Sequence, residues 1–80
     1  MVNGNYTERI FEYNNKGLGK QIGRCDYRGA KSNYVIKMAH SDAMAAVKLS
    51  KHKRVKVLVT KNDKRYNEGE RVIYKATIAA

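Results

Sequence analysis

The chain has 80 residues, with 17 Lys and Arg against 7 Asp and Glu, a net charge of +10 and a pI of about 10.0. This length fits one small domain and excludes a Rossmann dehydrogenase, a TIM barrel or a kinase. The longest uncharged apolar run, Ala43–Val47, is far shorter than a membrane span, and Met1–Asn15 lacks the apolar segment of a secretory signal. The single cysteine, Cys25, excludes an internal disulfide. We therefore expect one cytoplasmic domain over residues 1–80, with a loose start over residues 1–5.

The excess positive charge is spread along the chain, since residues 1–40 carry a net +4 and residues 41–80 a net +6. Self-repulsion of this size opposes the compact state of a 9.1 kDa domain. A polyanionic partner would offset it, and nucleic acid is the commonest polyanion. The simpler interpretation is a basic domain that has no such partner.

The first elements are expected to be strands. Tyr6–Tyr13 alternates as a half-buried strand does, and a short helix is the alternative. After a turn signal at Asn14–Gly17, we expect a strand over Gln21–Tyr27, because glycines disfavour a helix interior here. The more apolar face of the first strand comprises Thr7, Arg9, Phe11 and Tyr13.

The middle of the chain predicts a third strand and then the only helix. Asn33–Met38 has the composition of a strand. Ser41 is a good N-cap, and Asp42 would lie at the positive end of the helix dipole, so we expect a helix from Ser41 to about Lys51.

Two strands end the chain, Arg54–Thr60 and Glu70–Ala79, joined by the polar loop Lys61–Gly69. The resulting β-β-β-α-β-β order is that of the OB-fold, a small barrel that binds oligonucleotides. Residues 54–75, RVKVLVTKNDKRYNEGERVIYK, resemble the final hairpin of the small bacterial translation initiation factor with that fold, which implies the same topology. One helix packed on an open antiparallel sheet fits the order equally well. We therefore expect a small α+β domain, either an OB-like barrel or a helix on a sheet.

Residues that could carry catalysis are few. Cys25 with His40 or His52 offers a thiol and a base, but no third, orienting group is recognisable. These three also fall short of the four ligands of structural zinc. Glu8 and Glu12 fit surface ion pairs better than an acid–base pair in so cationic a chain. We expect no enzymatic activity, no metal and no cofactor.

Basic clusters interleaved with tyrosines are the strongest functional signal. Proteins that bind single strands need cations along the phosphates and aromatic faces for the bases. Solvated lysines with core or rim tyrosines are the simpler interpretation. The candidates form three groups: Lys20, Arg24, Arg28 and Lys31 with Tyr27 and Tyr34; Lys51, Lys53, Arg54 and Lys56 with His52; and Lys61, Lys64 and Arg65 with Tyr66.

These clusters predict a non-catalytic domain that binds single-stranded DNA or RNA with little base specificity, its affinity coming from counterion release. The alternative is a small inhibitor or interaction protein, of the kind that viruses and mobile elements encode, which docks on an acidic or nucleoprotein surface. No membrane partner is expected, and a homodimer that shares a core is left open. Binding to free nucleic acid at physiological salt would separate the two hypotheses.

Overall fold

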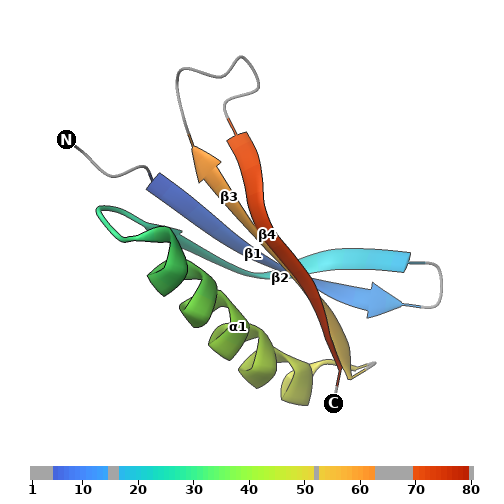
Figure 1. Ribbon diagram of the computed structural model, residues 1–80. Helices are drawn as coiled ribbons and strands as arrows, with labels where there is room; N and C mark the ends of the chain where they lie inside the picture. Colours follow the sequence, from blue (N-terminus) through green and yellow to red (C-terminus); the bar gives the residue numbers. More distant parts are fainter. Residues whose placement is uncertain (1–4, 15–16, 52, 63–69, 80) are drawn as a thin grey trace.

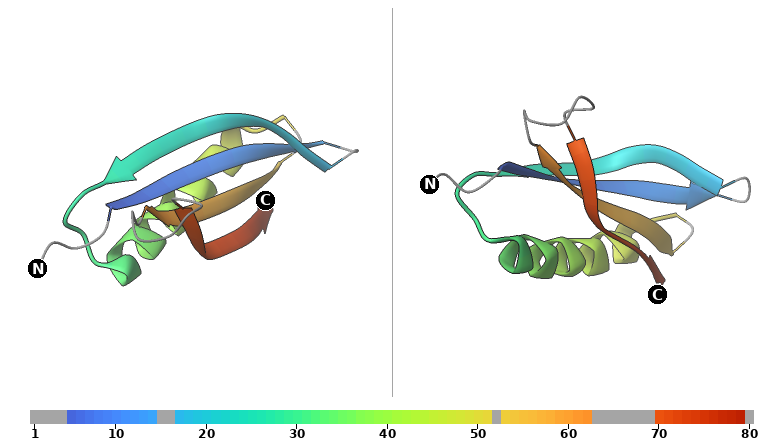
Figure 2. Two further views of the ribbon diagram at one scale, coloured as in Figure 1. Left: turned by 90° about the horizontal axis from the view of Figure 1, so that it is seen from above. Right: turned by 45° about the horizontal axis from the view of Figure 1, so that its top comes forward.

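The computed structural model describes residues 5–14, 17–51, 53–62 and 70–79, whose elements follow the order β-β-α-β-β. Neighbouring strands are antiparallel and lie in the spatial order β2-β1-β3-β4 (Figure 1). The helix runs along one face of this sheet, and no described element covers the other face (Figure 2). The elements are β1 (Asn5–Asn14), β2 (Gly17–Tyr27), α1 (Ser32–Leu49), β3 (Arg54–Asn62) and β4 (Glu70–Ala79).

The expected α+β class is confirmed, in the form of one helix packed on an open antiparallel sheet. The sheet does not close into an OB-like barrel, because β2 and β4 lie at opposite edges of the strand order and do not pair. The topology implied by the resemblance of residues 54–75 is therefore wrong, although the β3–β4 hairpin itself forms.

The strand predicted over Asn33–Met38 is also wrong, because this segment is the first third of α1. The helix begins at Ser32, directly after Lys31, and Ser41 is an exposed residue in its middle rather than its N-cap. Local composition favours a strand here, but propensity differences are only about 0.5 kcal/mol per residue. The helix instead buries one continuous stripe four residues apart, Val35, Ala39, Ala43 and Val47.

The core lies between this stripe and the covered face of the sheet. Val55, Val57 and Val59 of β3 are completely buried, as their alternation predicts. Ile10 of β1 lies opposite Val57 and is 4% exposed. Each such side chain contributes roughly 1.5–3 kcal/mol when it is fully buried.

β1 buries the face opposite to the more apolar one. Its register with β3 places Glu8 opposite Val59 and Ile10 opposite Val57, and paired side chains share a face of the sheet. The valines of β3 are all covered by α1, so they decide which face of β1 is covered as well. Phe11 and Tyr13 consequently remain half-exposed on the other side.

Candidate nucleic-acid interface

The side of the sheet away from α1, here called the open face, is formed by alternate residues of all four strands. The strand registers place Arg9 opposite Arg24, Phe11 opposite Lys56, and Leu58 opposite Lys75. The functional side chains on this face are Arg9, Phe11, Tyr13, Arg24, Asp26, Arg54, Lys56 and Lys75.

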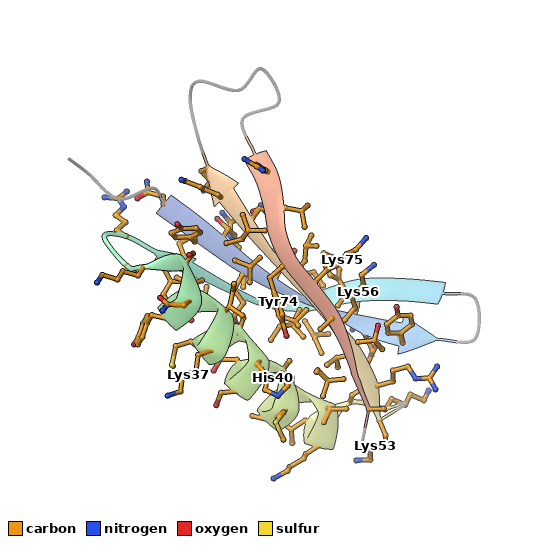
Figure 3. All side chains as sticks on the ribbon, in the orientation of Figure 1. Lys37, His40, Lys53, Lys56, Tyr74 and Lys75 are labelled. Carbon is orange, nitrogen blue, oxygen red and sulfur yellow. The ribbon has the colours of Figure 1, made fainter. Side chains whose placement is uncertain are left out.

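Positive charge dominates the open face. Arg9 and Arg24 are directly opposed on β1 and β2, and Lys56 and Lys75 are diagonal neighbours on β3 and β4. Figure 3 shows Lys56 and Lys75 side by side, pointing away from α1. Among the open-face side chains that the structure describes, Asp26 is the only carboxylate, and it lies 3.5 Å from Arg24. Since like charges at facing positions destabilise a sheet, an anion bound here would relieve the repulsion.

Two aromatic rings lie among these cations. Phe11 and Tyr13 are two positions apart on β1, which separates them by about 6.6 Å along the strand. The Tyr13 hydroxyl lies 3.3 Å from Thr77 Oγ1 on β4, so the Tyr13 side chain crosses over β3. Phe11 lies opposite Lys56. The open face therefore offers two aromatic side chains, of which Phe11 lies opposite a cation.

A chain of hydrogen bonds crosses three strands at the end of the open face where β1 begins. Asn62 Nδ2 donates to Thr7 Oγ1 at 3.1 Å, and the Thr7 hydroxyl donates to Asp26 Oδ1 at 2.9 Å. Nearby, Arg9 Nη1 donates to Thr60 Oγ1 at 3.2 Å. Thr7 is only 1% exposed, so a buried hydroxyl holds the Asp26 carboxylate in position.

The covered side of the sheet holds an acidic pair beneath α1. Glu8 is 2% exposed, and the Tyr27 hydroxyl donates to its Oε1 at 3.1 Å. Burial is the main cause that raises the pKa of Glu8 from 4.5 to about 7; the hydrogen bond and the charge of Asp42 raise it further, whereas the Tyr27 hydroxyl lowers it. Burial likewise raises the pKa of Tyr27, with Cys25 and Glu8 as further causes. Asp42 thus faces the sheet from the middle of α1.

The first predicted group does not form one surface. Arg24 is on the open face, whereas Tyr27 is on the covered side, where its hydroxyl bonds Glu8. The rings of Tyr27 and Tyr34 meet edge to face, with centroids 6.5 Å apart. These two tyrosines therefore pack the junction between β2 and α1. The remaining cations are exposed on β2 or in the connection after it: Lys20, Arg28 and Lys31.

The second predicted group is divided in the same way. Arg54 and Lys56 point to the open face, whereas Lys51 and Lys53 lie in the connection between α1 and β3. Lys53 Nζ donates to the carbonyl oxygen of Lys48 at 2.7 Å, and so caps the last turn of the helix. Of the third group, Lys61 ends up within β3, and the rest lies outside the described residues: Lys64, Arg65 and Tyr66.

Sequence reasoning missed five residues of the open face: Arg9, Phe11, Tyr13, Asp26 and Lys75. The signal was present, because the first three already share one face of an alternating strand. The apolar alternation of β3 determines which face of β1 is covered, because the two strands pair side by side.

The described residues hold no cluster of metal ligands, and no related protein is found. Among the residues that the structure describes, no three His, Cys, Asp or Glu side chains lie together as a metal site would require, and Cys25 is exposed. Within the same residues, α1 is too polar to cross a bilayer. Comparison of the chain with family models, curated proteins and solved structures finds no match.

Proposed function

We propose that the open face binds single-stranded nucleic acid without catalysis, and that the protein acts in the cytoplasm. The observation that carries this proposal is the pairing of like charges around two half-exposed aromatic rings on an uncovered sheet. Arg9 opposes Arg24, Lys56 neighbours Lys75, and Phe11 and Tyr13 lie among them.

The cations of the open face would bind the phosphates of a single strand, and its aromatic rings would bind the bases. Cations at Arg54, Lys56 and Lys75 would neutralise successive phosphates and release their counterions. The rings of Phe11 and Tyr13 would each stack against one base, a contact worth roughly 1–3 kcal/mol. Bases in a duplex have no free faces for such stacking, so we expect single strands to bind better than duplexes. Because phosphates and stacking provide most of the affinity, base specificity should be low.

Fluorescence anisotropy with labelled single-stranded RNA, single-stranded DNA and duplex DNA tests this proposal across a salt titration. If the five cations of the open face each neutralise one phosphate, the slope of log K against log salt should be about −3.5. Phe11→Ala combined with Tyr13→Ala should weaken single-strand binding by about tenfold or more. Tyr34→Ala, an exposed aromatic on α1, is the matched control and should leave affinity within about twofold.

The proposal is overturned if every nucleic acid dissociates near physiological salt with no preference among them. The open face would then fit an acidic protein groove better than a nucleic acid. A pull-down would identify that partner. The double variant Lys56→Gln/Lys75→Gln, which lacks two positive charges of the open face, would be the negative control.

A further inference from the structure

A pocket lies at the corner of the sheet where β1 begins and where β2 and β3 end. The pocket has a volume of about 180 Å³, enough for one ring system but not for a whole nucleotide chain. Its lining comes from three strands and the connection after β2: Asn5, Arg24, Asp26, Arg28 and Asn62, together with Tyr6 and Tyr27 from the covered side.

We propose that this pocket holds a single guanine base of the bound strand, and so adds a preference at one position to binding that is otherwise insensitive to sequence. This inference rests on the proposed function of the open face. It assigns the pocket to base recognition, whereas the cations and rings on the rest of the face bind phosphates and stack bases.

The Asp26 carboxylate is the one acidic group among the described residues that line the pocket. The Thr7 hydroxyl and the Arg24 guanidinium both contact its Oδ1, at 2.9 Å and 3.5 Å, and Asn62 in turn holds Thr7. The side chain of Asp26 is nevertheless 60% exposed. The carboxylate is therefore held in position from within the protein, and its Oδ2 is the acceptor that a ligand would meet.

The chemistry of the lining selects guanine among the bases. A carboxylate accepts hydrogen bonds, and guanine alone offers two adjacent donors, its N1–H and its 2-amino group. Uracil and thymine flank their single N–H with carbonyl oxygens that a carboxylate repels, and adenine and cytosine place an acceptor nitrogen beside the amino group. The opposite edge of guanine presents O6 and N7, the acceptors that arginine prefers, and Arg28 lines the pocket.

The pocket also lies within reach of the strand that binds the aromatic rings. Thr7, which supports Asp26, and Phe11 are on the same face of β1, four residues or about 13 Å apart. A short single strand that stacks on Phe11 can therefore cross the open face and place one further base at this corner.

The test compares ten-residue oligouridines that carry one central G, A or inosine with the all-U oligomer, by anisotropy at physiological salt. We expect the G oligomer to bind about tenfold more tightly than the all-U oligomer, and A no better than U. Inosine, which lacks the 2-amino group, should lose most of this gain. A single G also avoids the self-association of G-rich strands.

Asp26→Asn should reduce the G-to-U affinity ratio to within about twofold, and the fold should be kept because the amide oxygen can still accept from Thr7. Arg28→Ala, in the connection after β2, should lower the same ratio and serves as the second variant. Glu12→Gln removes one negative charge from the covered side and should leave the ratio unchanged. Ratios within one variant cancel the general electrostatic effect of each substitution.

Equal affinities for G, A and U, with all-U binding intact, would overturn this inference and leave the proposed function standing. An unchanged ratio in Asp26→Asn would also overturn it, because the preference would then arise elsewhere. Loss of all oligomers at physiological salt would instead overturn the proposed function, and the inference with it.

Discussion

The two faces of the sheet are built from the same four strands yet have opposite chemistry. On β3, the covered face presents Val55, Val57 and Val59, all completely buried, whereas the alternate residues Arg54 and Lys56 point to the open face. Because neighbours on a strand face opposite ways, one short segment supplies both the core and the cationic surface. Stability and binding should therefore respond to separate sets of substitutions.

The faces also differ in how an unfavourable charge is accommodated. On the covered side, Glu8 lies under α1 beside Asp42, and its raised pKa, caused chiefly by burial and then by Asp42, favours the neutral, protonated carboxyl. On the open face, Arg9 opposes Arg24, and the Arg24 guanidinium lies 3.5 Å from the Asp26 carboxylate. We therefore expect pH to act on the covered face and an anionic ligand to act on the open face.

The largest expected effect concerns the pH dependence of folding stability, which arises on the covered face. The pKa of Glu8 is raised from 4.5 to about 7, so the folded state binds the proton more tightly than the unfolded state does. This contribution to stability is complete below pH 4.5 and is lost as the pH rises through about 7. The loss is about 3 kcal/mol, since each pH unit between the two pKa values corresponds to about 1.4 kcal/mol.

Glu8→Gln should remove this dependence, because the amide stays neutral and can still accept the hydrogen bond from Tyr27. Urea unfolding of both proteins between pH 4 and pH 9 measures it. We expect similar stability at pH 4 and a more stable variant at pH 8. Glu12→Gln, on the same strand, controls for the charge change. Parallel curves for Glu8→Gln and the wild type would mean that the carboxyl is not a significant source of pH dependence.

The second largest effect tests whether single strands bind to the open face. The double reversal Lys56→Glu/Lys75→Glu should weaken single-strand binding about 100-fold, because two phosphate contacts become repulsive. The salt dependence should also fall by about 1.4 in log–log slope. Both positions are on the uncovered side, so the melting temperature should change little.

The matched control for that reversal is Lys37→Glu/Lys48→Glu, at two exposed positions of α1. It changes the net charge equally but on the other side of the molecule. A similar loss of affinity in both double variants would show that net charge alone drives binding, and that the open face has no special part in it.

A third pair of substitutions compares the two faces within one strand. Val57→Ala removes buried methyl groups between α1 and the sheet and should cost about 2 kcal/mol of unfolding free energy. Leu58→Ala, at the next position, should cost less than about 1 kcal/mol because Leu58 is only partly buried. Urea unfolding of both variants measures the difference. Equal costs would indicate that something covers the open face in solution.

The sequence predicted the strands well because their alternation is strong and local. Arg54–Thr60 and Glu70–Ala79 lie within β3 and β4, and Tyr6–Tyr13 lies within β1. The error at Asn33–Met38 has a tertiary cause: two valines and two alanines, four residues apart, become a helical stripe only when a sheet is there to cover them.

The candidate site was predicted in part, and for a related reason. Arg24, Arg54 and Lys56 were identified from charge alone and are on the open face. The pattern of tyrosines among cations also selected Tyr27, which instead packs on the covered side, where its hydroxyl donates to the buried Glu8 carboxyl. Which face is open depends on the pairing of β1 with β3, a contact between residues about 50 positions apart.

The smallest effect concerns Lys53. It is close to Lys56 in the sequence, but its side chain bonds to the end of α1. Its backbone has a φ of 54°, where glycine is less strained than lysine, and its Nζ caps the helix through Lys48. Relief of strain and loss of the capping bond oppose each other, so Lys53→Gly should change unfolding free energy by less than about 0.5 kcal/mol. Affinity for single strands should stay within about twofold, whereas Lys56→Gly should lose several-fold. A loss at Lys53 as large as that at Lys56 would extend the interface around the edge of the sheet to the end of the helix.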